Sequence, residues 1–67
     1  MNIEIAEKIV ECVKQCDIQL KEIENIIENI EDPEERKSMR RKLGEIVGSI
    51  YVEILRPIEL EYPSLTI

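Results

Sequence analysis

Apolar residues follow a helical period along the first half of the chain. Successive members of one set lie alternately three and four residues apart, which places them at the a and d positions of four heptads. The set consists of Ala6, Ile9, Val13, Cys16, Leu20, Ile23, Ile27 and Ile30. The pattern predicts a first helix over about residues 3–30.

Further apolar residues lie on both sides of this stripe. Ile3 and Val10 fall at e positions, and Ile5, Cys12 and Ile26 fall at g positions. A helix that is apolar at its a and d positions and at both flanks needs more than one neighbouring helix to cover it. The first helix therefore predicts an assembly larger than a simple pair of helices.

The sequence IEDPEE marks a break between two helices. The Asp32 side chain can accept a hydrogen bond from a free backbone N–H, Pro33 suits the first helical position, and Glu35 completes the capping-box spacing. A second helix is expected to begin at about residue 33. Because so few residues separate the two helices, we expect them to fold back as an antiparallel hairpin.

The second helix continues the apolar stripe and then becomes apolar around most of its circumference. Its stripe comprises Met39, Leu43, Ile46 and Ile50, and only Gly48, Ser49 and Glu53 are not apolar between residues 46 and 55. Such a segment must be covered on several sides. The β-branched residues over 47–54 leave a β-strand as the alternative. Pro57 lacks an amide proton and is predicted to end this helix at about residue 56.

Residues 57–67 alternate between apolar and polar positions, which predicts an extended C-terminal tail. The tail is expected either to pack over the apolar end of the second helix or to dock on another protein as a short linear segment. The side chains proposed for docking are Ile58, Leu60, Tyr62 and Leu65.

A chain of 67 residues forms a marginal core when it folds alone. Small domains are otherwise stabilised by disulfides, metals or oligomerisation, and two cysteines without any histidine favour oligomerisation. The expected fold is therefore all-α: a hairpin over residues 1–56 that dimerises into a four-helix bundle. Because two glycines four apart suggest close approach of another helix, or a groove for a partner's side chain, the expected interface comprises Gly44, Val47, Gly48, Tyr51, Ile54 and Leu55.

Charge is segregated along the chain. The net charge is −6, yet five cations lie within residues 36–42: Arg36, Lys37, Arg40, Arg41 and Lys42. In an antiparallel hairpin this run returns beside Glu22, Glu24 and Glu28, so it is expected to neutralise the first helix. The alternative is a contact surface for nucleic acid or an acidic protein.

The composition gives little support for catalysis. There is no histidine, hydroxyl side chains are few, and the glutamates fall mostly on outward positions of the first helix. Cys16 is expected to be a small buried apolar residue, with a four-thiolate metal site across a dimer as the alternative. We expect a non-enzyme without a cofactor or a metal, and a cytoplasmic protein because no membrane span or leader is evident.

The leading functional hypothesis is a protein-interaction module, such as a dimeric regulator, an inhibitor, antitoxin or immunity-type protein, or an assembly adaptor. The layout over residues 3–56, two helices joined by a short acidic turn, resembles that of the Rop-like plasmid copy-number regulators. The resemblance is one of layout alone, and no functional residue is carried over from it. The alternative function is an RNA- or DNA-binding regulator that uses the basic run, which the net negative charge disfavours.

Overall fold

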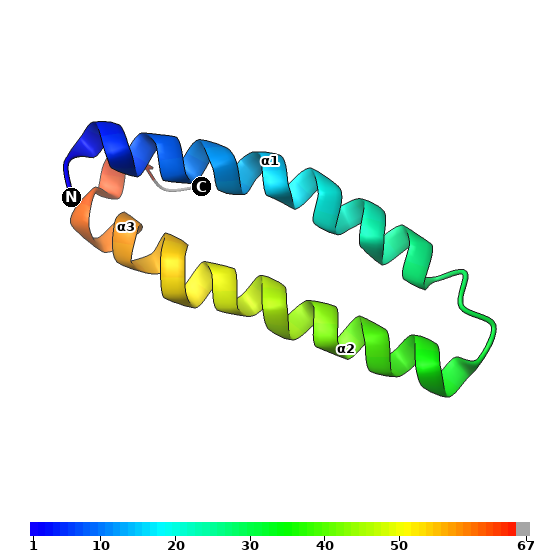
Figure 1. Cartoon of the computed structure of the whole chain (residues 1–67). Helices are drawn as coiled ribbons and strands as arrows, with labels where there is room; N and C mark the ends of the chain where they lie inside the picture. The colour runs from blue at the N-terminus through cyan, green and yellow to red at the C-terminus, as the bar shows by residue number, and fades with distance from the viewer. Residues whose placement is uncertain (66–67) are drawn as a thin grey trace.

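The computed structural model describes residues 1–65, and these form an antiparallel pair of long helices with a short third helix at one end (Figure 1). Helix α1 spans Ile3–Ile27 and helix α2 spans Pro33–Ile50. A π-helical turn (Tyr51–Leu55), helix α3 (Arg56–Glu61) and a 3₁₀ turn (Pro63–Leu65) follow. The all-α class is confirmed, and because residues 1–65 contain no strand, the alternative of a strand over 47–54 is wrong.

Side-chain caps fix where the two long helices begin. The Asn2 side chain accepts a hydrogen bond from the Ile5 amide at 2.9 Å, and the Asp32 side chain accepts one from the Glu34 amide at 3.1 Å. Helix α1 ends at Ile27 rather than at residue 30, and the turn after it is held by the Arg36 guanidinium, which donates to the Ile30 carbonyl at 3.0 Å. The short acidic connection therefore reverses the chain as predicted.

The predicted stop at Pro57 is wrong. The chain stays helical through this residue, because the turn before it changes from α to π geometry and the Arg56 amide donates to the Tyr51 carbonyl, five residues earlier. A proline disrupts the α-helical bond to the residue four positions back, and a π turn is a common way for a helix to absorb such a disruption with a kink. The predicted extended tail is accordingly wrong for residues 57–61, which belong to α3.

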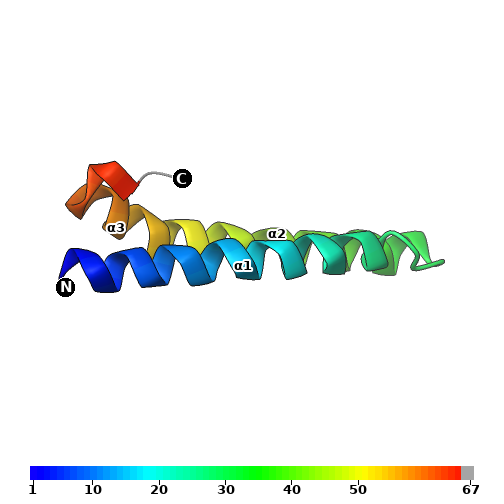
Figure 2. The same ribbon diagram turned by 90° about the horizontal axis from the view of Figure 1, so that it is seen from above.

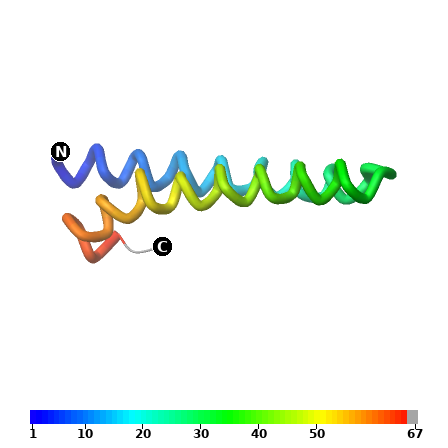
Figure 3. The backbone as a smooth tube through the Cα atoms, turned by 90° about the horizontal axis from the view of Figure 1, so that it is seen from below, coloured from blue at the N-terminus to red at the C-terminus, as the bar shows by residue number. Residues whose placement is uncertain are grey.

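Helix α3 lies over one face of the hairpin, at the end that holds the N-terminus (Figures 2 and 3). The π turn brings Leu55 and Ile58 against Ala6 and Val10 of α1, and these four side chains form the buried core cluster. Partly buried residues around it are Ile9, Val13, Tyr62 and Leu65. The tail thus packs on its own chain as far as residue 65, while Thr66 and Ile67 lie outside the described residues.

Tyr62 adds a polar contact at this end of the molecule. Its hydroxyl donates a hydrogen bond to the Met1 carbonyl. Desolvation, the largest cause, raises the pKa of Tyr62 above its usual value of 10.0, and a hydrogen bond and the negative charge from Glu61 act in the same direction. A higher pKa of this phenol favours its protonated form, which is the form that donates to the Met1 carbonyl.

The molecule is elongated for its length. Its extents are 46 × 17 × 14 Å and its radius of gyration is 14.7 Å. A compact domain of this length would have a radius of gyration of about 11 Å. Apart from the end that α3 covers, the hairpin is a single layer of two helices (Figure 2). Along most of this layer, no other helix of residues 1–65 lies on either face.

Candidate interaction surface

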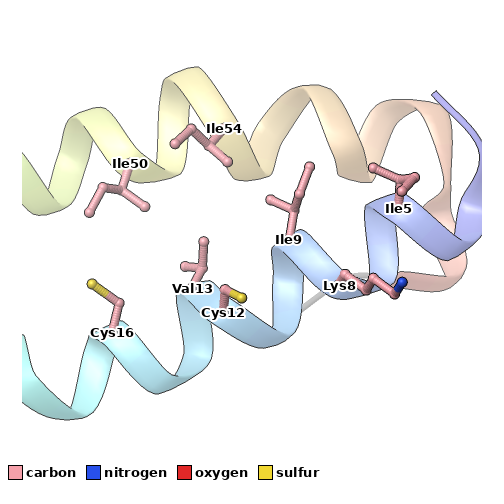
Figure 4. Close-up of a pocket in the computed structure, with 8 residues that line it drawn as sticks. All are labelled: Ile5, Lys8, Ile9, Cys12, Val13, Cys16, Ile50 and Ile54. Carbon is pink, nitrogen blue, oxygen red and sulfur yellow. The ribbon is translucent and has the colours of Figure 1, made fainter.

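An apolar groove runs between α1 and α2 near the N-terminus of α1 (Figure 4). Its volume is about 430 Å³. In the close-up, Val13 and Cys16 point from α1 toward α2, and Ile50 points back toward them. The lining residues are Ile5, Lys8, Ile9, Cys12, Val13, Cys16, Ile50 and Ile54. Lys8 is the one charged side chain in this lining, so the groove can bury apolar surface at little electrostatic cost.

The position of the groove follows from the heptad pattern of α1. Helix α3 covers the a and e positions Ala6 and Val10, and the d residue Ile9 packs partly against the same cluster, which leaves the g positions and the d position of Cys16 without a covering element. Ile5 and Cys12 at g, and Cys16 at d, are all exposed. Cys16 was expected to be buried, and that expectation is wrong for the single chain because no helix lies over its edge of the stripe.

The same apolar surface continues toward the middle of the hairpin. A second hollow of about 470 Å³ along α2 shares Ile50 and Ile54 with the groove and adds Ile46, and its rim is formed by the polar residues Glu45, Ser49 and Glu53. On α1 the d and g pattern continues to Ile23 and Ile26, which are exposed. We refer to these residues together as the open face: Ile5, Ile9, Cys12, Cys16, Ile23 and Ile26 of α1 with Ile46, Ile50 and Ile54.

A different groove of about 340 Å³, which we call the glycine groove, lies between α1 and α2 farther along the hairpin. Asp17 and Glu24 line this groove, and both fall at e positions of α1. Val10, which packs against α3, is also at an e position, so the glycine groove lies on the side that α3 occupies. A Cβ atom added at Gly44 or Gly48 would meet nothing within 4 Å. The full lining is Asp17, Leu20, Lys21, Glu24, Arg40, Leu43, Gly44 and Val47.

The residues predicted for a dimer interface do not share one environment. Tyr51 and Ile54 are exposed, and Val47 lines the glycine groove. Leu55 is only 8% exposed and packs against α1 within the same chain, which leaves little of its side chain for contact with a second chain. The π turn explains this packing, since it places Leu55 against Ala6.

The residues predicted for tail docking also differ in their exposure. Ile58 is 1% exposed and lies in the core cluster, so in this structure its side chain packs within its own chain. Tyr62 and Leu65 are partly buried against the same cluster. Leu60, at 68% exposed, is the member that remains available.

The basic run is partly engaged within the hairpin, through Arg40 and Glu28, whereas Glu22 and Glu24 have no ion-pair partner among the described residues. The Arg40 guanidinium donates two hydrogen bonds to the Glu28 carboxylate, at 2.9 and 2.8 Å. Both side chains are about half exposed, so the pair contributes only about 0.5 kcal/mol. Arg36 holds the turn, whereas Lys37, Arg41 and Lys42 have no ion-pair partner among the residues that the structure describes.

Other sites can be described briefly. Within residues 1–65, no cluster of three or more Cys, Asp or Glu side chains is arranged to hold a metal ion. The two cysteines are free thiols. No helix in this part of the chain has both the length and the apolar content needed to cross a membrane.

Comparisons with protein-family models, with curated proteins and with solved structures gave no match for this chain. The proposals below therefore rest on the surface of the hairpin itself.

Proposed function

We propose that this chain is a non-catalytic protein-interaction module that works as a homodimer, in which two hairpins pack into a four-helix bundle. The observation that carries the proposal is the imbalance between buried and exposed apolar residues. Among residues 1–65, five apolar residues are buried, whereas thirteen large apolar residues are exposed. A helix surface of this kind in water calls for a covering partner.

The exposed area supports the same proposal quantitatively. The chain has 5250 Å² of accessible surface. A compact monomer of its mass would expose about 4400 Å², so the hairpin exposes about 800 Å² more. That excess is close to the area that each partner contributes to a protein interface of ordinary size. A second hairpin would therefore bring the exposed surface per chain down to the value of a compact protein.

Charge indicates which further partner such a dimer would attract. The net charge is −6, and Glu4, Glu7 and Glu11 form an exposed acidic edge on α1 at helical spacing. None of these three carboxylates has an ion-pair partner among the described residues. A basic protein surface would be steered toward this field, mainly through the association rate.

The proposed function is tested by capture from the native cell with a matched charge variant. The bait is the wild-type chain, and the control carries Glu4→Gln, Glu7→Gln and Glu11→Gln, which keep size and helical propensity. We expect a basic protein that binds the wild type, survives nuclease treatment and is reduced at least tenfold with the control. Capture that disappears after nuclease treatment would contradict the proposal.

The alternative function is binding of RNA or DNA, and the unpaired cations Lys37, Arg41 and Lys42 are the observation that favours it. A nucleic-acid complex held by several phosphate contacts loses affinity steeply as salt rises. We expect no measurable binding of RNA or duplex DNA even at low salt. Tight binding with a steep salt dependence would replace the proposed function with this alternative.

A further inference from the structure

We infer that the second copy packs on the open face, so that the interface is formed by the g and d edge of α1 and by Ile46, Ile50 and Ile54, and not by the glycine groove. This inference rests on the proposed dimer and says which of the two uncovered surfaces forms it. The two surfaces differ in charge and in their relation to α3, and both differences favour the open face.

The first difference is the cost of removing charges from water. The groove on the open face has Lys8 at its edge and otherwise apolar side chains, and the neighbouring hollow along α2 adds Glu45 and Glu53. The glycine groove contains four charged residues, Asp17, Lys21, Glu24 and Arg40. Removing such groups from water is expensive even when they are paired, and Glu24 has no ion-pair partner among the described residues. A second helical layer is therefore better accommodated on the open face.

The second difference is room for a second hairpin. Helix α3 rises from one face of the hairpin and leaves the other free along its length (Figures 2 and 3). Asp17 and Glu24 place the glycine groove on the α3 side, where α3 limits the approach of a long partner. Cys12 and Ile5 place the open face on the opposite edge, where two hairpins can lie against each other over most of their length.

The open face can also pair with itself. A twofold dimer joins the same patch on both copies, and the overlap is largest when the axis passes through the middle of the patch. On α1 the open face runs from Ile5 to Ile26, and its middle lies at Cys16. The second copy would therefore bury the thiols of Cys12 and Cys16, both of which are exposed in the single chain.

Two neighbouring residues of α2 give a matched pair of variants. Ile46 belongs to the open face and is 55% exposed, whereas Val47 lines the glycine groove and is 39% exposed. We expect Ile46→Glu to raise the dimer dissociation constant by more than about 100-fold and Val47→Glu to raise it by less than about 5-fold, because a charge buried in an apolar interface is strongly unfavourable. Sedimentation velocity of the two variants measures both constants, with circular dichroism as the check on helicity.

The outcomes separate the inference from the proposed function. If the wild type is a dimer that Val47→Glu weakens and Ile46→Glu leaves unchanged, the assignment of the face is overturned. The proposed dimer itself would remain. If neither variant weakens the wild-type dimer, the assignment of the face is also overturned, because a different surface must then form the dimer. A folded wild-type monomer would contradict the proposed dimer and the inference together.

A measurement on the wild-type chain avoids any effect of the variants on folding. The rate at which a maleimide or a thiol-specific disulfide reagent labels Cys12 and Cys16 is compared below and above the concentration at which the chain associates. We expect labelling to slow by at least about tenfold on association, because only the dimer buries these thiols. Equal rates in both ranges would show that the open face stays exposed in the dimer, and would overturn the inference.

Discussion

Ile58→Ala is expected to lower the free energy of unfolding by about 2–4 kcal/mol, the range for truncating a large apolar side chain in a packed core. Ile58 is 1% exposed and packs with Ala6, Val10 and Leu55 in the core cluster. Few other buried contacts hold α3 on α1. Loss of this side chain should therefore release α3 and expose the N-terminal part of α1.

Leu60→Ala is the matched control, since Leu60 lies in the same short helix but is 68% exposed. Its effect should remain within about 0.5 kcal/mol, as is usual for surface positions. Urea unfolding followed by circular dichroism, at one protein concentration for all variants, measures both changes. Equal effects of the two substitutions would mean that α3 does not pack through Ile58.

The second large effect is a melting temperature that depends on protein concentration. When two chains fold and associate in one step, mass action stabilises the native dimer by about 1.4 kcal/mol for each tenfold rise in concentration. For two chains of 67 residues the unfolding enthalpy is on the order of 90 kcal/mol. The melting temperature should therefore rise by about 5 °C for each tenfold increase.

Thermal scans between about 10 and 100 µM are suitable for this measurement. Ile58→Ala serves as an informative control, because it removes a contact within one chain. We expect it to lower every melting temperature while leaving the slope against concentration nearly unchanged. A melting temperature that is independent of concentration would indicate that the single hairpin already has all of its stabilising contacts.

The two long helices could be predicted because their signals are local. The three-and-four spacing from Ala6 onward fixes a helical period, and Asp32 with Pro33 starts the next helix where the sequence indicates. Even the reversal of direction follows from the short connection. These features depend on neighbouring residues, and a single sequence contains that information.

The end of the second helix could not be predicted in the same way. Pro57 is a reliable helix breaker in isolation, but here the π turn over Tyr51–Leu55 absorbs the disruption and the helix continues. Whether a helix kinks or ends at a proline depends on what the following turn can bury. In this chain Ile58 packs against Ala6 and Val10, which lie more than forty residues away in sequence. No local sequence pattern predicts that contact.

The candidate surface was only partly predictable for a related reason. The apolar flanks at Ile5 and Cys12 are visible in the sequence as g positions, and in the structure both residues line the groove between α1 and α2. The sequence does not reveal that α3 covers the e edge of α1 or that Leu55 packs there within its own chain. Which edge of the stripe is left uncovered follows only from the folded position of α3.

The mass of the native chain in solution tests most directly whether a second copy completes this hairpin. Sedimentation equilibrium at about 10–100 µM should give twice the chain mass of 7.9 kDa, together with the helical circular dichroism of a folded protein. A stably folded species with the mass of one chain across this range would contradict the dimer.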